Sequence, residues 1–181
     1  MYFLKQHIVL FFSAFILAPY FSFAQNPKED SLKVSIAFEK NDSAKVMQMA
    51  ALFDIYQRDY RIEDCKLLAE QAVEVADKNG SKNLIGIVNL LKGVSYKEQE
   101  EYEKAQTYLL IALKNINGET NRKHLGDANS YMGFIQEQMN VYKKAVSYHR
   151  TALQIRSTIS EKATSNSLLR LATCFTNLKM K

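Results

Sequence analysis

The sequence predicts an all-α fold of stacked antiparallel helix pairs, and three observations lead to this prediction. A pattern of residues recurs along the chain with a period of 40. Apolar residues return at the three- and four-residue spacing of an amphipathic helix. Glycine and proline, which break helices, number only 6 and 2 in 181 residues. A fixed period of this length indicates helix pairs that bury their apolar faces against one another.

The repeat is clearest in two stretches, "EYEKAQTYLLIALKNI" from Glu101 and "VYKKAVSYHRTALQIR" from Val141. A weaker copy precedes them, with Ile62 and Cys65 at the matching positions. Small residues at matched positions let helices cross closely, and the tyrosines fill the space near each interhelical turn. The predicted repeat-packing residues are Gly93, Tyr96, Tyr102, Ala105, Ala112, Gly133, Tyr142, Ala145 and Ala152.

Each unit is expected to contain two helices joined by polar linkers. The predicted helices are 42–59, 62–79, 82–99, 102–117, 120–139, 142–159 and 162–179. They group into units near 46–85, 86–125 and 126–165, with a half unit at 166–181, in one repeat domain spanning 42–181. Residues 25–41 are either a short leading helix or an extended arm. Asp42 is expected to cap the first repeat helix, and Gly80 and Gly118 suit left-handed helix ends.

The first 24 residues have the layout of a secretory signal peptide. Lys5 precedes the apolar run "IVLFFSAFILAPYF", and Ser22 and Ala24 suit the positions before a cleavage site that leaves Gln25 first. The alternative is an uncleaved anchor, but the run is shorter than the roughly 20 residues of a spanning helix and contains Pro19. We therefore expect an exported bacterial protein, periplasmic or secreted, with no membrane segment after cleavage.

Composition and residue spacing favour a protein without catalytic or cofactor chemistry. The net charge is +5, but acids and bases alternate along the helices, so a nucleic-acid surface is not expected. The three histidines are scattered and form no spaced Cys/His pairs, so no metal site is predicted. Cys65 and Cys174 are expected to be separate buried thiols, and the alternative is an intermolecular disulfide through Cys174. Ser147 and His149 are two residues apart and do not face each other on a helix.

These repeats resemble the tetratricopeptide repeat. "GVSYKEQEEYEKAQTYLLIAL" carries the glycine, aromatic, tyrosine and two alanines of that family in order, and the next unit departs at Gln136, which replaces an aromatic. The period of 40 exceeds the usual 34 and is similar to the variant found in exported sensor regions of bacterial regulators. The resemblance covers roughly residues 42–179. It implies a right-handed superhelical solenoid of about three and a half repeats.

In the resembled family, the first helix of each pair lines a concave groove that binds a peptide or a partner helix. Transferred position by position, the predicted groove residues are Asp54, Gln57, Arg58, Lys97, Ser130, Phe134, Glu137, Gln138, Arg170 and Asn177. Ile87, Leu90 and Val94 also occupy matching positions, and Leu90, Val94 and Phe134 belong either to the groove or to the core. Because Ile87, Leu90 and Val94 are apolar, the clamp for a terminal carboxylate found in some family members is not expected.

The last half unit has an apolar stripe for which the repeat provides no following helix. The stripe is predicted as a docking surface and consists of Leu168, Leu171, Phe175 and Leu178. The leading hypothesis is an exported, non-catalytic scaffold that binds an unknown protein or peptide. One alternative is the periplasmic sensory portion of a membrane-bound regulator whose kinase or DNA-binding output is not in this chain. The other is a self-association module that uses the stripe.

Overall fold

The computed structural model describes residues 26–159 and 161–179, and this part of the chain is all-α. The predicted signal peptide at 1–24 lies outside the described residues. The helices are α2 (Pro27–Phe38), α3 (Asp42–Arg58), α4 (Ile62–Asn79), α5 (Lys82–Glu98), α6 (Tyr102–Asn115), α7 (Arg122–Gln138), α8 (Tyr142–Ser157) and α9 (Glu161–Lys179). Residues 27–38 therefore form a leading helix, which was one of the two alternatives for this segment. Over the described residues, none of the helices combines the length and the apolar character needed to cross a bilayer.

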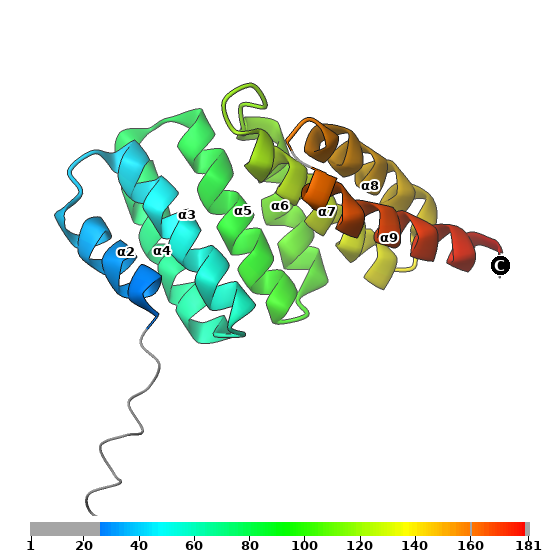
Figure 1. The fold of residues 1–181 in the computed structure, drawn as a ribbon, viewed down its shortest axis with the longest axis horizontal. Coiled ribbons are helices and arrows are strands. Elements are labelled where there is room, and N and C mark those ends of the chain that lie inside the picture. The colour runs from blue at the N-terminus through cyan, green and yellow to red at the C-terminus, as the bar shows by residue number, and fades with distance from the viewer. Residues whose placement is uncertain (1–25, 160, 180–181) are drawn as a thin grey trace, which may run out of the picture.

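The helices are arranged in sequence order along one row and form two layers (Figure 1). Each helix packs against the next one in the chain. Contacts that skip one helix connect α3 with α5, α5 with α7 and α7 with α9, whereas within the described residues α4, α6 and α8 make no such contacts with one another. The layer of α3, α5, α7 and α9 is therefore the inner one, in which helices of successive pairs meet directly.

The turns inside the three helix pairs share an unusual backbone conformation at a spacing of 40 residues. Tyr60, Glu100 and Asn140 have φ angles of 55°, 61° and 59°, in the left-handed region that residues other than glycine seldom adopt. In each turn the next backbone N–H donates back to the last turn of the first helix, as from Glu101 to Tyr96 O at 3.0 Å. This pattern ends a helix and reverses the chain, so the 40-residue period is present in the backbone itself.

The helix ends between the pairs differ in part from the sequence prediction. Asn41, not Asp42, is the cap of α3, because its side chain accepts the N–H of Ala44 at 2.9 Å. Gly80 ends α4 with a φ of 71°, as predicted. Gly118 does not adopt a positive φ, because α6 already ends at Asn115 and the next residue, Ile116, is extended. The prediction for Gly118 was therefore wrong.

Gly93 and Gly133 lie where the two helices of a pair cross closely. A Cβ atom on Gly93 would be 2.8 Å from Leu109 Cγ, and one on Gly133 would be 2.5 Å from His149 Cε1. Neither glycine could carry a side chain without displacing its neighbour. Ala105 is fully buried opposite Gly93, and its carbonyl oxygen is 3.2 Å from the same hypothetical Cβ.

The other repeat-packing residues also lie at the interfaces between helices. Ala112, Ala145 and Ala152 are fully buried. Tyr96 stacks on Tyr108 with ring centroids 5.2 Å apart. The remaining two predicted tyrosines are half-buried: Tyr102 packs edge-on against Phe134, and Tyr142 donates a hydrogen bond to Asn140 Oδ1 at 2.9 Å.

The core divides into a large cluster that runs from α3 to α7 and a small one between α8 and α9. Ile87, Leu90 and Val94 belong to the large cluster and are almost fully buried, so they are core residues and not groove residues. Cys65 and Cys174 are both buried free thiols.

The predicted docking stripe on α9 is divided between core and surface. Leu171 is buried in the small cluster, and Leu178 packs against it. Leu168 and Phe175 remain 54% and 42% exposed, and Leu169 beside them is 68% exposed. The prediction of one continuous docking surface is therefore wrong, because the face of α9 that carries Leu171 packs against α8.

Candidate functional site

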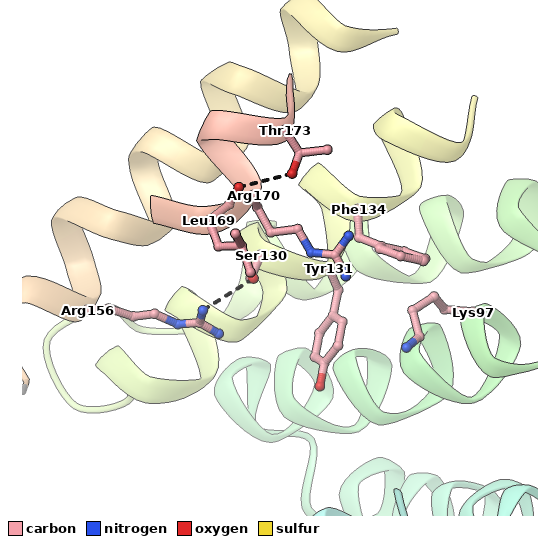
Figure 2. Close-up of a pocket in the computed structure, with 8 residues that line it drawn as sticks. All are labelled: Lys97, Ser130, Tyr131, Phe134, Arg156, Leu169, Arg170 and Thr173. Atoms are coloured by element: carbon pink, nitrogen blue, oxygen red, sulfur yellow. Dashed lines mark hydrogen bonds between the residues drawn. The ribbon is translucent and has the colours of Figure 1, made fainter. Parts of the chain in front are cut away.

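A pocket of about 410 Å³ lies between the inner helices α5, α7 and α9, with one residue from the last turn of α8. Figure 2 shows side chains from these helices converging on it. The lining residues are Lys97, Ser130, Tyr131, Phe134, Arg156, Leu169, Arg170 and Thr173. Three of the eight are cations and none is an acid, so the lining favours an anionic ligand.

The aromatic side chains of α7 hold two of the cations in place. Lys97 Nζ lies 5.2 Å from the ring centroid of Tyr131 and 5.4 Å from that of Phe134. The Arg170 guanidinium lies 5.0 Å from the Phe134 ring centroid, and Figure 2 shows it beside that ring. Phe134 is thus contacted by a cation from α5 and by one from α9. Attraction to an aromatic ring orients a cation without neutralising its charge, so Lys97 and Arg170 are both held in place and remain positively charged.

Each cation also has an acidic partner outside the pocket lining. Lys97 contacts Glu98 at 2.6 Å, and Arg156 contacts Asp127 at 2.7 Å. Arg156 also donates to Ser130 Oγ at 3.3 Å, so its position is defined by several contacts. Arg170 has only a 3.3 Å contact with Glu137, and its side chain is 45% exposed. Arg170 is therefore the cation that can most readily turn toward a ligand.

A chain of hydrogen bonds supports the pocket from the neighbouring repeat. Tyr131 Oη donates to Gln57 Oε1 at 3.0 Å, and Gln57 Nε2 donates to Glu98 Oε1 at 2.9 Å. Burial raises the pKa of Tyr131 well above its usual range, so the phenol stays neutral and remains a donor. Gln57 was predicted to contact a ligand, but it acts here as a link between α3, α5 and α7.

The structure brings together four of the ten predicted groove residues, which are Lys97, Ser130, Phe134 and Arg170. The others lie elsewhere. Asp54 accepts a hydrogen bond from Lys123 at 2.9 Å. Arg58 and Gln138 are exposed, and Asn177 is half-buried near the end of α9.

Four pocket residues were missed by the sequence prediction: Tyr131, Arg156, Leu169 and Thr173. Arg156 belongs to the second helix of its pair, which the family resemblance places away from the groove. Its long side chain reaches the inner layer from the end of α8, where it meets Asp127. This contact could be predicted only if the helix ends that lie side by side were already known, and the sequence does not give that information.

Glu137 is not a groove residue, because it is buried at the interface of α7, α8 and α9. Its Oε1 atom is 2.5 Å from His149 Nε2 and accepts a hydrogen bond from Cys174 Sγ at 3.4 Å. Burial raises the pKa of Glu137, but the contacts with His149, Cys174 and Arg170 lower it more. The net pKa is below its usual value, so this carboxyl group stays ionised to a lower pH than an exposed glutamate does. Burial, together with the charge of Glu137, raises the pKa of the Cys174 thiol to about 12.

The fold and the pocket define an all-α helical repeat protein with a cationic and aromatic cavity on its inner layer. The sequence matches no protein-family model and no curated protein. Its fold is similar to the crystal structure of BtubC (BKLC) from P. vanneervenii, with a TM-score of 0.64 and 15% sequence identity. The match covers 83% of this chain and 65% of that one. The chain thus spans slightly less than two thirds of that structure, and a likeness at this identity shows the fold alone.

Proposed function

We propose that this chain is an exported, non-catalytic scaffold of tetratricopeptide-like repeats that holds an acidic segment of a partner protein in its inner pocket. The observation that carries the proposal is a lining with three cations and no acid, in which aromatic rings hold two of the cations. Carboxylate side chains match this lining, because an arginine can bind a carboxylate with two parallel hydrogen bonds. The solenoid form is part of the proposal and would place the pocket on an extended concave face.

Several features of the pocket favour a peptide over a small molecule. The cations come from three helices, so they can contact acidic side chains spaced along an extended segment. Leu169 adds an apolar side chain to the lining, and Thr173 adds an uncharged polar one. Further along the inner layer, Asp54, Lys123 and Asp127 alternate in sign, which would set the register of a longer segment.

The test compares the purified protein with two double variants of equal charge change. The probe is an array of synthetic peptides that carry two or three Asp or Glu residues at varied spacing, each beside a copy with Asn or Gln instead. Lys97→Gln with Arg170→Gln removes two pocket cations. The control, Lys143→Gln with Lys144→Gln, removes two exposed cations from α8.

We expect the purified protein to prefer the acidic peptides, and the pocket double variant to bind them at least about tenfold more weakly, since about 1.4 kcal/mol corresponds to tenfold. The control should bind almost as well as the unchanged protein. Equal losses in both variants would show that only overall charge matters and would contradict the pocket assignment. Glu137 is left unchanged because it is buried and its replacement would disturb packing.

A further inference from the structure

Three side chains that commonly bind metals meet at the interface of α7, α8 and α9. Glu137, His149 and Cys174 have exposures of 8%, 0% and 0%. Their potential ligand atoms all lie within 4.8 Å of one another. A thiol, an imidazole and a carboxylate are the donors that zinc and similar divalent transition metals take in proteins. The sequence prediction missed this cluster because its members are separated by 12 and 25 residues and lie on three helices.

The repeat contains its own comparison for this cluster. One period earlier, the matching residues are Lys97, Leu109 and Phe134. Leu109 packs on Gly93 in the same way as the His149 ring packs on Gly133. Similarly, Lys97 lies over the Phe134 ring, and one period later Glu137 contacts Cys174. In the preceding unit the same place in the fold is thus filled by a leucine and by a lysine that lies over an aromatic ring, without a buried histidine. Packing of the repeat does not require a buried histidine beside a buried carboxylate, and burying such groups carries a desolvation cost.

The cluster as it stands also leaves a buried polar atom unsatisfied. His149 Nδ1 has no hydrogen-bond partner among the described residues, although its ring is fully buried. Buried polar atoms without partners are rare in native proteins, so this histidine is not held as an ordinary hydrogen-bonded core residue. The nitrogen that lies beside Glu137 is Nε2, so an ion between the three side chains would bind Nε2 and not Nδ1. The second oxygen of Glu137 is held by Arg170 at 3.3 Å, which is the kind of outer contact that orients a metal-binding carboxylate.

The three potential ligand atoms lie within 4.8 Å of one another, so small shifts would bring them around one ion. Tetrahedral zinc with bonds of about 2.0–2.3 Å keeps neighbouring ligand atoms about 3.3–3.8 Å apart. The Glu137 oxygen and the Cys174 sulfur already meet this at 3.4 Å, whereas the Glu137 and His149 atoms at 2.5 Å must separate by about 1 Å. Three protein ligands leave one position for water or another group. A thiolate and a carboxylate would neutralise the charge of a divalent ion.

We propose that Glu137, His149 and Cys174 form a binding site for one divalent transition metal ion of the zinc type, which fastens α9 to α7 and α8. The ion would replace the proton of the Cys174 thiol and draw on one ring nitrogen of His149. This proposal does not rest on peptide binding in the pocket.

The experiment uses the purified protein after removal of metals with a chelator. Zn²⁺ is titrated by calorimetry, and Co²⁺ is titrated in the spectrophotometer, where a charge-transfer band from thiolate to cobalt reports a Co–S bond. We expect one Zn²⁺ per chain, and a Co²⁺ spectrum with this band and the d–d bands of a tetrahedral site. Failure of the unchanged protein to bind either ion with a Kd below about 10 μM would overturn the proposal, since structural zinc sites bind far more tightly.

Two single variants identify the ligands. Cys174→Ala and His149→Leu should each weaken Zn²⁺ binding by at least about 100-fold, because loss of even an outer-shell partner commonly costs 10- to 100-fold. Cys65→Ala is the matched control, since Cys65 is the other fully buried thiol and belongs to a different core cluster. Cys174→Ala alone decides the matter if His149→Leu fails to fold. Loss of the thiolate band in Cys65→Ala, with the band retained in Cys174→Ala, would refute the site.

Discussion

At the residue scale, the two matched glycines show how one position serves different neighbours in successive repeats. Gly93 admits a leucine side chain, whereas Gly133 admits the ring of His149. In both cases the missing Cβ sets the distance between the paired helices. The sequence identified these glycines as crossing points, but it did not show that one of them makes room for a buried histidine.

We predict that Gly133→Ala destabilises the protein by about 1–3 kcal/mol. The added Cβ would lie 2.5 Å from His149 Cε1 and within 2.7 Å of both ring nitrogens, so the ring must move. Gly126→Ala is the control, because its Cβ would lie 3.3 Å from Arg156 Cγ and 3.4 Å from Ile155 Cγ2, which are far less close approaches. Urea unfolding followed by circular dichroism measures both variants. Equal stabilities for the two would contradict the close crossing at Gly133.

At the element scale, the three turns inside the helix pairs place a residue other than glycine in the left-handed conformation. The strain differs with the residue, because asparagine tolerates this conformation better than glutamate or tyrosine does. Asn140 also accepts a hydrogen bond from Tyr142 Oη at 2.9 Å. The turn after α7 is therefore better adapted to its backbone than the turn after α5, where Glu100 is exposed.

We predict that Glu100→Gly stabilises the protein by about 0.5–1 kcal/mol, because glycine adopts a positive φ without steric cost. Asn140→Gly, at the same position of the next repeat, should change stability by less than about 0.5 kcal/mol or lower it slightly, since it loses the contact with Tyr142. Thermal unfolding of both variants at one pH provides the comparison. A destabilised Glu100→Gly variant would show that this side chain has a role that the turn geometry does not explain.

At the scale of the whole molecule, stability is distributed unevenly along the row of helices. The large core cluster extends from α3 to α7, whereas α8 and α9 share a small cluster built on Ala145, Val146, Leu171 and Cys174. α9 also exposes Leu168 and, at the pocket, Leu169. In a stacked array each helix pair is stabilised mainly by its neighbours. Among the described helices α9 packs only on α7 and α8, so we expect it to be less stable than the middle of the row.

We predict that backbone amides in the middle of α9 exchange with deuterium at least about tenfold faster than those in the middle of α5 in the metal-free protein, because local opening is easiest where few apolar contacts must break. Hydrogen exchange with mass spectrometry of peptides from the two helices measures this difference, after correction for intrinsic rates. Equal protection of α5 and α9 would mean that the array unfolds as one cooperative unit. Protection of α9 that rises with added Zn²⁺ would connect this behaviour to the proposed metal site.

The helices, their pairing and the positions where they cross can be predicted from the sequence alone. Apolar spacing, polar linkers and the 40-residue period are local or repeated signals, so the helix ranges from α3 to α9 follow from them to within two residues at each end. The smaller errors, Asp42 in place of Asn41 and the conformation of Gly118, concern single residues at helix ends, where local chemistry permits several solutions.

The side chains that meet across different helices can be identified only in the folded chain. The pocket joins Lys97 of α5 with Arg156 of α8 and Arg170 of α9, and the buried cluster joins Glu137, His149 and Cys174. These contacts depend on the rotation of each helix and on the reach of its side chains. A helical period defines the apolar face of one helix, but it does not define the neighbour that each residue on that face will contact. For this reason four of the predicted groove residues line the pocket, while Glu137 belongs to the buried cluster.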